Sequence, residues 1–183
     1  RRREEILRAA LRLFVRKGYA GTKVGDIAEA VGMSTGLMFH YFESKEALYE
    51  ELIGLGVDGP MAMMDGGAGG DAIAFFEGAA ASILGFLREE PFMADMFVLM
   101  GNALMDYAIP PRAKELLAGF DVNAPTAEMV RRGQREGTVR DGDPVALSIA
   151  FWAAIQGIAE ELAVYPDMPC PEPEWIVDIV RKR

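Results

Sequence analysis

The chain has 183 residues, of which 51% are hydrophobic and 26% are charged, so it can bury a core and is not disordered throughout. Its net charge of −9 argues against a uniformly basic nucleic-acid binder. The charge is uneven, however: residues 1–50 carry nine Lys/Arg against seven Asp/Glu, and residues 51–183 carry ten against twenty-one. This distribution permits a polyanionic partner at the N-terminal end, although chance surface composition explains it equally well.

Short helices are predicted in the first fifty residues. Apolar residues recur at three- and four-residue spacing between residues 4 and 17, and Gly18 stands where a helix-ending glycine belongs. A second apolar stripe covers residues 24–31. A third short helix is expected over residues 34–41, and Ser44 is the candidate N-cap of a fourth.

The rest of the chain also has helical periodicity. The glycine-rich segment 61–71 is expected to be an interdomain loop. Further helices are predicted over residues 71–90, 91–107, 112–136 with a break near 121–125, 144–165 and 174–183. No stretch alternates with period two for long enough to predict a strand, so the expected fold class is all-α.

The compartment is predicted from the start of the chain and from its cysteine. No apolar run approaches about 18 residues without a polar interruption, so we expect no membrane span. The opening Arg1-Arg2-Arg3 is not a signal peptide, and the missing Met leads us to expect further native residues before it. Cys170 is the single cysteine and lies between prolines, which favours an inert thiol in a reducing cytoplasm.

The first three predicted helices match a helix-turn-helix unit inside a three-helix bundle. Helices of seven or eight residues are unstable alone, so the second and third must pack on the first. The tight turn at Gly32-Met33 would join them. Gly36 lies inside the third helix, where glycine costs about 1 kcal/mol relative to alanine. Its presence is explained if a surface such as DNA passes very close.

The run from Gly18 to Leu48 resembles the DNA-binding signature of the TetR (tetracycline-repressor) family, most specifically in the string STGLMFHYFESKE at residues 34–46. A weaker similarity follows at residues 133–137 and 143–144. The resemblance implies a helix-turn-helix DNA-binding domain at residues 1–48 and a helical ligand-binding and dimerisation domain at 49–183. It further implies a homodimeric repressor that binds a palindromic operator, is released by a small apolar molecule and needs no cofactor.

The resemblance assigns DNA contacts residue by residue. Positions that touch base edges in the family correspond to Thr35, Gly36 and Leu37. Positions that contact phosphates correspond to His40, Tyr41 and Lys45, while Thr22 and Lys23 stand at the start of the second helix and Phe39 on the exposed side of the third. Thr35 replaces a common Lys, Leu37 a common Thr or Ser, and Lys23 a hydroxyl. The first two replacements leave methyl groups that favour thymine and put the operator sequence in doubt.

Methionine and phenylalanine are abundant between residues 61 and 105. Core packing is the simpler explanation for any one of them, but methionine also adapts to varied ligands and the resemblance implies an apolar pocket. Polar groups near such a pocket would orient a ligand. The candidate pocket residues are Met64, Phe86, Met96, Met100, Asn102, Tyr107 and Gln156.

The predicted helix 144–165 is apolar on nearly all sides, and such a helix must be buried. A partner subunit is the expected cover in a chain of this size. The resemblance implies that the last two helices of each subunit form a four-helix interface. Its candidate residues are Phe151, Trp152, Ile155, Ile158, Trp175 and Ile179.

Two rival functions remain to be compared with a DNA-binding regulator. The first is a protein-interaction module without specific DNA binding. The second is an enzyme, for which Glu160 and Glu161 are the best acidic pair, yet adjacent carboxylates on a helix face different directions. His40 is the only histidine, so neither a histidine-based metal site nor a catalytic triad is expected.

Overall fold

The structure is a computed structural model that describes residues 1–67 and 70–183. The chain is 74% helical. Within the described residues the only extended pairing is an isolated antiparallel bridge between Val139 and Arg181. These observations confirm the all-α prediction.

Contacts divide the chain into two compact units. Unit 1 comprises residues 1–58 and 95–120, and unit 2 comprises residues 59–94 and 121–183. Helices α4 (Lys45–Gly67) and α6 (Pro91–Met105) have residues in both units. A domain boundary after residue 48 stays a prediction, because neither unit is one continuous segment of chain.

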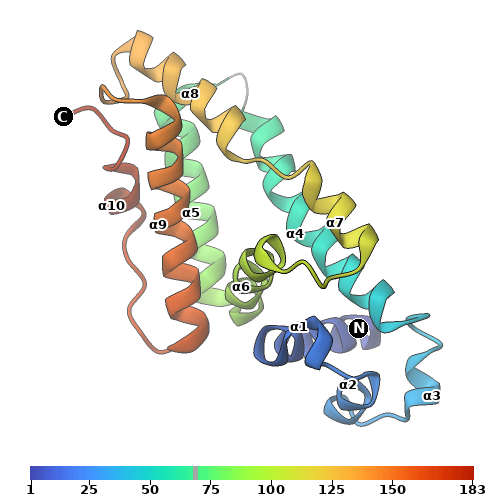
Figure 1. The fold of residues 1–183 in the computed structure, drawn as a ribbon. Coiled ribbons are helices and arrows are strands. Elements are labelled where there is room, and N and C mark those ends of the chain that lie inside the picture. The colour runs from blue at the N-terminus through green and yellow to red at the C-terminus, as the bar shows by residue number, and fades with distance from the viewer. Residues whose placement is uncertain (68–69) are drawn as a thin grey trace. The chain divides into compact units, whose positions relative to one another are not determined.

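Unit 1 contains the predicted short helices of the N-terminal region. They are α1 (Arg2–Gly21), α2 (Val24–Ala30) and α3 (Thr35–Met38), which follow one another at the lower end of Figure 1 and are joined there by the first part of α4. The short helix α7 (Pro111–Ala118) also belongs to this unit. Gly18 has a φ of 71°, so the regular helix that begins at Arg2 stops at the predicted glycine. Ile6, Leu11 and Phe14 from α1 are almost completely buried.

Unit 2 is built on α5 (Ala72–Glu89), α8 (Asn123–Glu136), α9 (Pro144–Val164) and α10 (Pro173–Val177). Figure 1 shows α5, α9 and α10 side by side, in agreement with their contacts. Local signals place the helix ends: the carboxylates of Asp71 and Asp143 accept backbone N–H groups two and three residues later. Gly137, with a φ of 76°, ends α8.

The predicted loop at residues 61–71 is wrong over its first part, because α4 continues through Pro60 to Gly67. Residues 68 and 69 of the predicted loop lie outside the described residues. Tertiary contacts account for the continuation: Met64 is 3% exposed, and the Thr126 hydroxyl lies 3.5 Å from its sulfur. Packing of this apolar turn overrides the weak helix propensity of its glycines.

The last predicted helix is also shorter than expected, since α10 ends at Val177. The residues after it pair with the segment between α8 and α9: Arg140 N donates to Val180 O at 2.9 Å, and Lys182 N donates to Thr138 O at 3.0 Å. A chain segment that forms such bridge hydrogen bonds is extended and cannot remain in the helix.

Helix α9 is the one described helix that is long and apolar enough to cross a membrane by length and composition, which differs from the expectation of no such segment. Core helices of soluble proteins pass the same test. One side of α9 packs on α5 and α8. The other side leaves Val145, Ile149 and Val164 between 42% and 66% exposed.

This arrangement corrects two of the predicted interface residues. Phe151 and Ile155 are completely buried within unit 2, where the Phe151 ring packs edge-on against Phe76 at 4.9 Å, so neither is available to a partner. Trp152 is half-buried and its indole N–H donates to the Thr126 hydroxyl at 3.0 Å. Ile158 and Ile179 are also half-buried, and Trp175 is 66% exposed.

Candidate nucleic-acid interface

The turn between α2 and α3 is held by backbone hydrogen bonds. Gly32, with a φ of 63°, donates its N–H to Glu29 O, and Met33 N donates to Ala28 O, both at 3.0 Å. This pair of bonds is the Schellman pattern. It requires one residue in the left-handed conformation, which glycine adopts without strain. The Ser34 hydroxyl then accepts the Leu37 N–H at 3.2 Å and caps α3.

One side of α3 anchors it and the opposite side is open. Met38 is completely buried together with Ile27 of α2. Regular helix ends at Met38, earlier than predicted, but Tyr41 N and Phe42 N both donate to Met38 O, so turns continue the same surface. The open side, which we call the recognition surface, consists of the exposed residues Thr35, Gly36, Leu37, Phe39, His40 and Tyr41.

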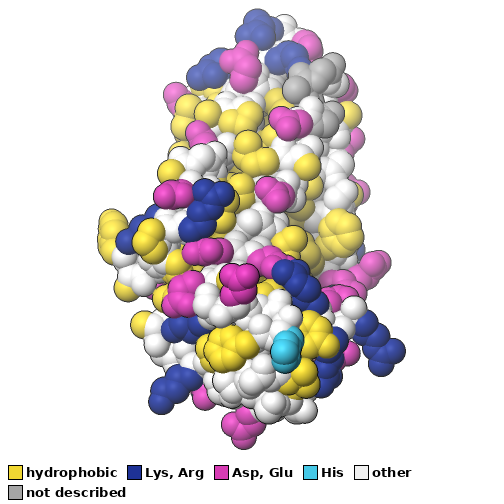
Figure 2. All heavy atoms as spheres, turned by 90° about the vertical axis from the view of Figure 1, so that its right-hand side faces the viewer, with side chains coloured by type: hydrophobic (Ala, Val, Ile, Leu, Met, Phe, Trp, Pro, Cys, Tyr) yellow, Lys and Arg dark blue, Asp and Glu magenta, His cyan; other side chains and the backbone are white. Residues whose placement is uncertain are grey.

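The recognition surface has an unusual composition for a solvent-exposed surface. Leu37, Phe39 and Tyr41 are 46%, 47% and 38% exposed. Figure 2 shows the histidine beside hydrophobic side chains, with basic side chains nearby. Apolar groups flanked by hydrogen-bonding and basic ones suit a major groove, which offers thymine methyl groups beside base edges and phosphates.

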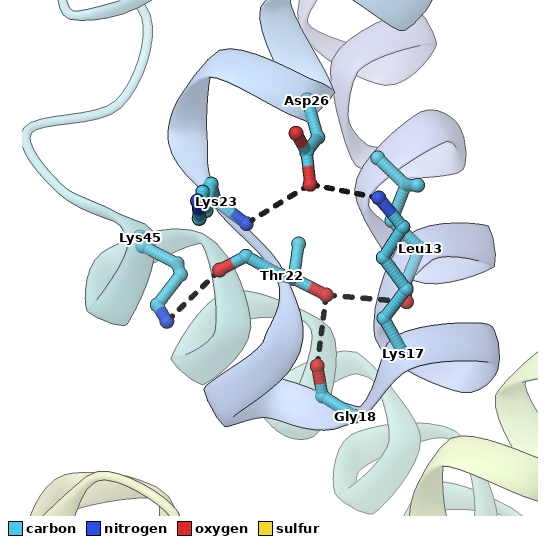
Figure 3. Close-up of polar contacts among 7 residues, drawn as sticks. All are labelled: Leu13, Lys17, Gly18, Thr22, Lys23, Asp26 and Lys45. Atoms are coloured by element: carbon cyan, nitrogen blue, oxygen red, sulfur yellow. Dashed lines mark hydrogen bonds and ion pairs between the residues drawn. The ribbon is translucent and has the colours of Figure 1, made fainter.

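Thr22 does not belong to this surface, which corrects its predicted DNA contact. The residue is 1% exposed, and its hydroxyl lies 2.8 Å from Gly18 O and 3.2 Å from Leu13 O, to which it donates (Figure 3). The last carbonyls of a helix have no intrahelical donor. The Thr22 hydroxyl supplies one at the end of α1 and so joins α1 to the start of α2.

Lys45 also has a structural role. Its ammonium donates to Thr22 O at 3.0 Å (Figure 3). It also donates to Tyr19 O at 2.9 Å and lies 4.2 Å from the centre of the Tyr19 ring. These contacts tie the first residue of α4 to the end of α1. Because an ammonium has three N–H donors, one remains for a phosphate after these two bonds.

Lys23 is exposed immediately before α2. Its backbone N–H points to the carboxylate of Asp26 at 3.4 Å, and the same carboxylate pairs with Lys17 at 2.8 Å (Figure 3). The hydrogen bond from Lys17 holds the pKa of Asp26 below its ordinary value, so the carboxylate stays charged and fixes the start of α2. The Lys23 side chain is placed on the surface, in agreement with a phosphate contact.

Replacing Thr22 by valine is expected to lower the free energy of unfolding by about 1–2 kcal/mol, because the hydrogen bonds of its buried hydroxyl to Gly18 O and Leu13 O are lost while side-chain shape is kept. Urea denaturation followed by circular dichroism measures the change. Thr35→Val is the matched control: the Thr35 hydroxyl is exposed, so water can take over its hydrogen bonds when it is removed. Equal stability of the two variants would contradict the role assigned to the Thr22 hydroxyl.

The predicted pocket residues do not form one group. Met96 and Met100 are buried in unit 1. Both side chains lie close to Gly56, and a Cβ added at Gly56 would overlap the Met100 sulfur. Met64 lines a cavity of about 340 Å³ in unit 2 with Met61, Met129 and arginines of α8. Phe86 and Tyr107 are 52% and 90% exposed, and Gln156 donates to Glu160 at 2.8 Å.

A second cavity, of about 400 Å³, lies wholly within unit 1 and includes only Asn102 of the predicted pocket residues. We call it the aromatic cavity, and it is lined by Phe14, Val15, Gly18, Tyr19, Tyr49, Leu99, Asn102, Met105 and Asp106. Sequence reasoning missed it, because its lining comes from α1, α4 and the end of α6, which are far apart in the chain.

The fold of residues 1–45 and the exposed side of α3 define a helix-turn-helix domain. Residues 6–52 match the family described as bacterial regulatory proteins, tetR family. The transcriptional repressor KstR2 of Rhodococcus jostii is 42% identical over 52 residues, which are 28% of this chain and 26% of that protein. The repressor AcnR of Corynebacterium diphtheriae is 48% identical over 48 residues, or 26% and 25%. The chain therefore matches about a quarter of the length of these curated relatives.

Solved structures extend the likeness in fold to nearly the whole chain. The MbdR regulator of Azoarcus sp. CIB has a TM-score of 0.75 and 24% identity, covering 98% of this chain and 96% of that one. AibR, in complex with isovaleryl coenzyme A and operator DNA, has a TM-score of 0.69 and 17% identity, covering 97% and 95%.

Residues 6–52 therefore resemble the matching segment of tetR-family transcriptional regulators. This confirms the resemblance seen in the sequence. The relatives that the chain matches are regulators, which are not enzymes, in agreement with the predicted absence of catalysis.

Proposed function

We propose that the chain is a ligand-responsive transcriptional repressor of the cytoplasm that binds a palindromic operator as a homodimer. The observation that carries this proposal is the recognition surface, which is exposed and rigidly held in the segment that matches the tetR family. Curated relatives over this segment are repressors.

We expect different residues of the recognition surface to contact bases and phosphates. Thr35, Gly36 and Leu37 lie at the start of α3, which is the part of a recognition helix that reaches base edges. The methyl groups of Thr35 and Leu37 favour thymine. His40, Tyr41 and Lys23 are exposed donors that suit phosphates and set the position on the duplex, while Phe39 supplies an apolar flank.

Fluorescence anisotropy with duplexes from upstream of the chain's own gene tests operator binding. At fixed moderate salt, we expect one short palindrome to bind at least about a thousandfold more tightly than a scrambled duplex, since specific sites exceed nonspecific ones by that factor or more. Affinity should fall as salt rises, because phosphate contacts release counterions. Equal and weak binding to every duplex would contradict the proposal and favour a protein-interaction module.

The dimer would form through the exposed side of α9. Val145, Ile149, Ala153 and Gly157 follow one another every four residues on this side, and all four are exposed. A stripe of apolar and small residues at this spacing lets a second helix approach closely. A twofold dimer would also place two recognition helices about 34–36 Å apart to meet successive major grooves.

Replacing Ile149 by lysine is expected to convert a dimer into a monomer without unfolding it. Ile149 is 51% exposed in one subunit, so the charge is tolerated there, whereas a twofold interface brings two such lysines together. Sedimentation velocity measures the mass. Leu104→Lys, at a residue that is 54% exposed on α6, is the control. An unchanged mass for Ile149→Lys would exclude this side of α9 as the interface.

The effector would act through α4. This helix carries Lys45, which is bonded to the end of α1, and also Met64, which lines the cavity in unit 2. The structure of AibR contains isovaleryl coenzyme A, which has a short branched acyl chain. A small, mainly apolar effector that binds the DNA-free state more tightly lowers operator affinity by the same free energy. A screen for molecules that reduce the anisotropy signal tests this step.

A further inference from the structure

The aromatic cavity combines aromatic rings with negative charge. The Tyr49 ring lies 5.0 Å from Phe14 and 4.8 Å from Tyr19, both in edge-on arrangements. Phe14 and Tyr49 are 2% exposed, so these rings form a fixed wall. Asp106, an acidic residue, lines the same cavity. Rings and a carboxylate together are the groups that bind organic cations, because the ring face is electronegative.

The surrounding charges have the sign that a cation needs. None of the described lining residues is a lysine or an arginine. Burial and the charge of Asp106 raise the pKa of Tyr49 to about 12. Burial and the hydrogen bond to Glu46 raise the pKa of Tyr19, to which the charge of Glu50 adds. The charge of Asp106 acts on Tyr49 and those of Glu46 and Glu50 act on Tyr19, while the Lys45 ammonium lies 4.2 Å from the Tyr19 ring.

The Asp106 carboxylate is also fixed in position. One of its oxygens accepts the Ala108 N–H at 2.7 Å, which holds the side chain in the turn after α6. A carboxylate that is already oriented loses little freedom when a ligand ammonium arrives. Its second oxygen has lone pairs for such a donor.

We propose that the aromatic cavity binds a small organic ammonium ion, with the charged nitrogen near Asp106 and the apolar part against Phe14, Tyr19 and Tyr49. A volume of about 400 Å³ lies within the range of small-molecule sites. The assigned ligand is cationic, which separates this site from the apolar effector expected from the sequence.

The cavity also touches the residues that hold the helix-turn-helix domain together. Its lining includes Gly18, whose carbonyl accepts the Thr22 hydroxyl at 2.8 Å, and Tyr19, whose carbonyl accepts the Lys45 ammonium at 2.9 Å. A ligand beside these two residues would bias the end of α1 and the start of α4. An effect on operator affinity therefore follows if the proposed DNA-binding function holds.

Isothermal titration calorimetry of the full chain without DNA tests the site directly. The probes are phenethylamine, neutral phenethyl alcohol and anionic phenylacetate at pH 7.5 and millimolar concentration. We expect phenethylamine to bind about tenfold to a hundredfold more tightly than the alcohol, the range of a charge-assisted hydrogen bond. Phenylacetate should not bind. Equal affinities, or no binding of the amine, would overturn the proposal.

Asp106→Asn should reduce the difference between the amine and the alcohol to less than about threefold, because the amide keeps the turn but lacks the charge. Asp121→Asn is a matched control: its carboxylate likewise accepts a backbone N–H two residues later, at 2.8 Å, but lies outside the cavity. Loss of amine binding in both variants, or in neither, would also contradict the assignment.

A final anisotropy titration of operator DNA with phenethylamine tests the regulatory consequence, which rests on the proposed function. A shift in operator affinity that Asp106→Asn removes supports an effector role. Amine binding without any shift in a chain that binds operator overturns that role. Failure of operator binding itself leaves the calorimetric result intact and rejects only the proposed function.

Discussion

Replacing Gly36 by alanine is expected to weaken operator binding by about tenfold or more while leaving the free protein at least as stable. A Cβ at Gly36 would meet no atom within 4 Å in the free chain, and the backbone there is ordinary helix. Alanine favours a helix over glycine by about 1 kcal/mol, so stability should stay the same or rise. Only a surface that approaches α3 closely can penalise the added methyl group.

Two measurements separate these effects: urea denaturation for the free protein and anisotropy for the operator complex. Gly78→Ala in α5 is a matched control, because this glycine is also exposed, lies within a helix and has no neighbour within 4 Å of an added Cβ. We expect the control to gain similar stability and to bind operator as the parent does. Unchanged operator affinity in Gly36→Ala would show that DNA does not approach this part of α3.

Replacing Gly133 by alanine is expected to destabilise unit 2 by about 1–3 kcal/mol, the usual range for overfilling a packed core. A Cβ on Gly133 would overlap the Val139 side chain and lie 2.9 Å from the Cβ of Ala72. Val139 and Ala72 are both completely buried, so neither has free space into which to move. The overlap would lie where α8 contacts the first residue of α5 and the Val139–Arg181 bridge.

Thermal unfolding followed by circular dichroism measures this change, with an expected decrease in Tm of about 2–4 °C for each kcal/mol in a chain of this size. Gly85→Ala in α5 is the control, because an added Cβ there meets nothing within 4 Å. The control should be neutral or slightly more stable. A Gly133→Ala chain as stable as its parent would mean that α8 can shift away from Val139.

The sequence likeness between the chain and tetR-family regulators is strongest in the segment that contains residues 6–52. The repressors KstR2 and AcnR are 42% and 48% identical to the chain over 52 and 48 residues. Over the rest, likeness is in fold alone, at identities below 25%. The cavities of this chain therefore have to be interpreted from their own residues.

Local signals were sufficient to determine much of this protein from its sequence. Apolar residues at three- and four-residue spacing predicted helices, and Gly18 and Ser44 marked helix ends, because these rules act within one or two turns. The recognition surface was predicted for the same reason, since its residues all lie between positions 35 and 41, in α3 and directly after it. The resemblance of residues 34–46 to the TetR-family signature then predicted a DNA-binding regulator.

Only the tertiary structure decided the features that depend on residues distant in the chain. Thr22 was expected on DNA but is buried beneath α1, and Lys45 bonds to carbonyls that lie 23 and 26 residues before it. Packing of Met64 carries α4 past Pro60, and Phe151 belongs to the subunit's own core. Helical periodicity shows that a side is apolar, but not which partner covers it, because that choice is made by packing between separate elements.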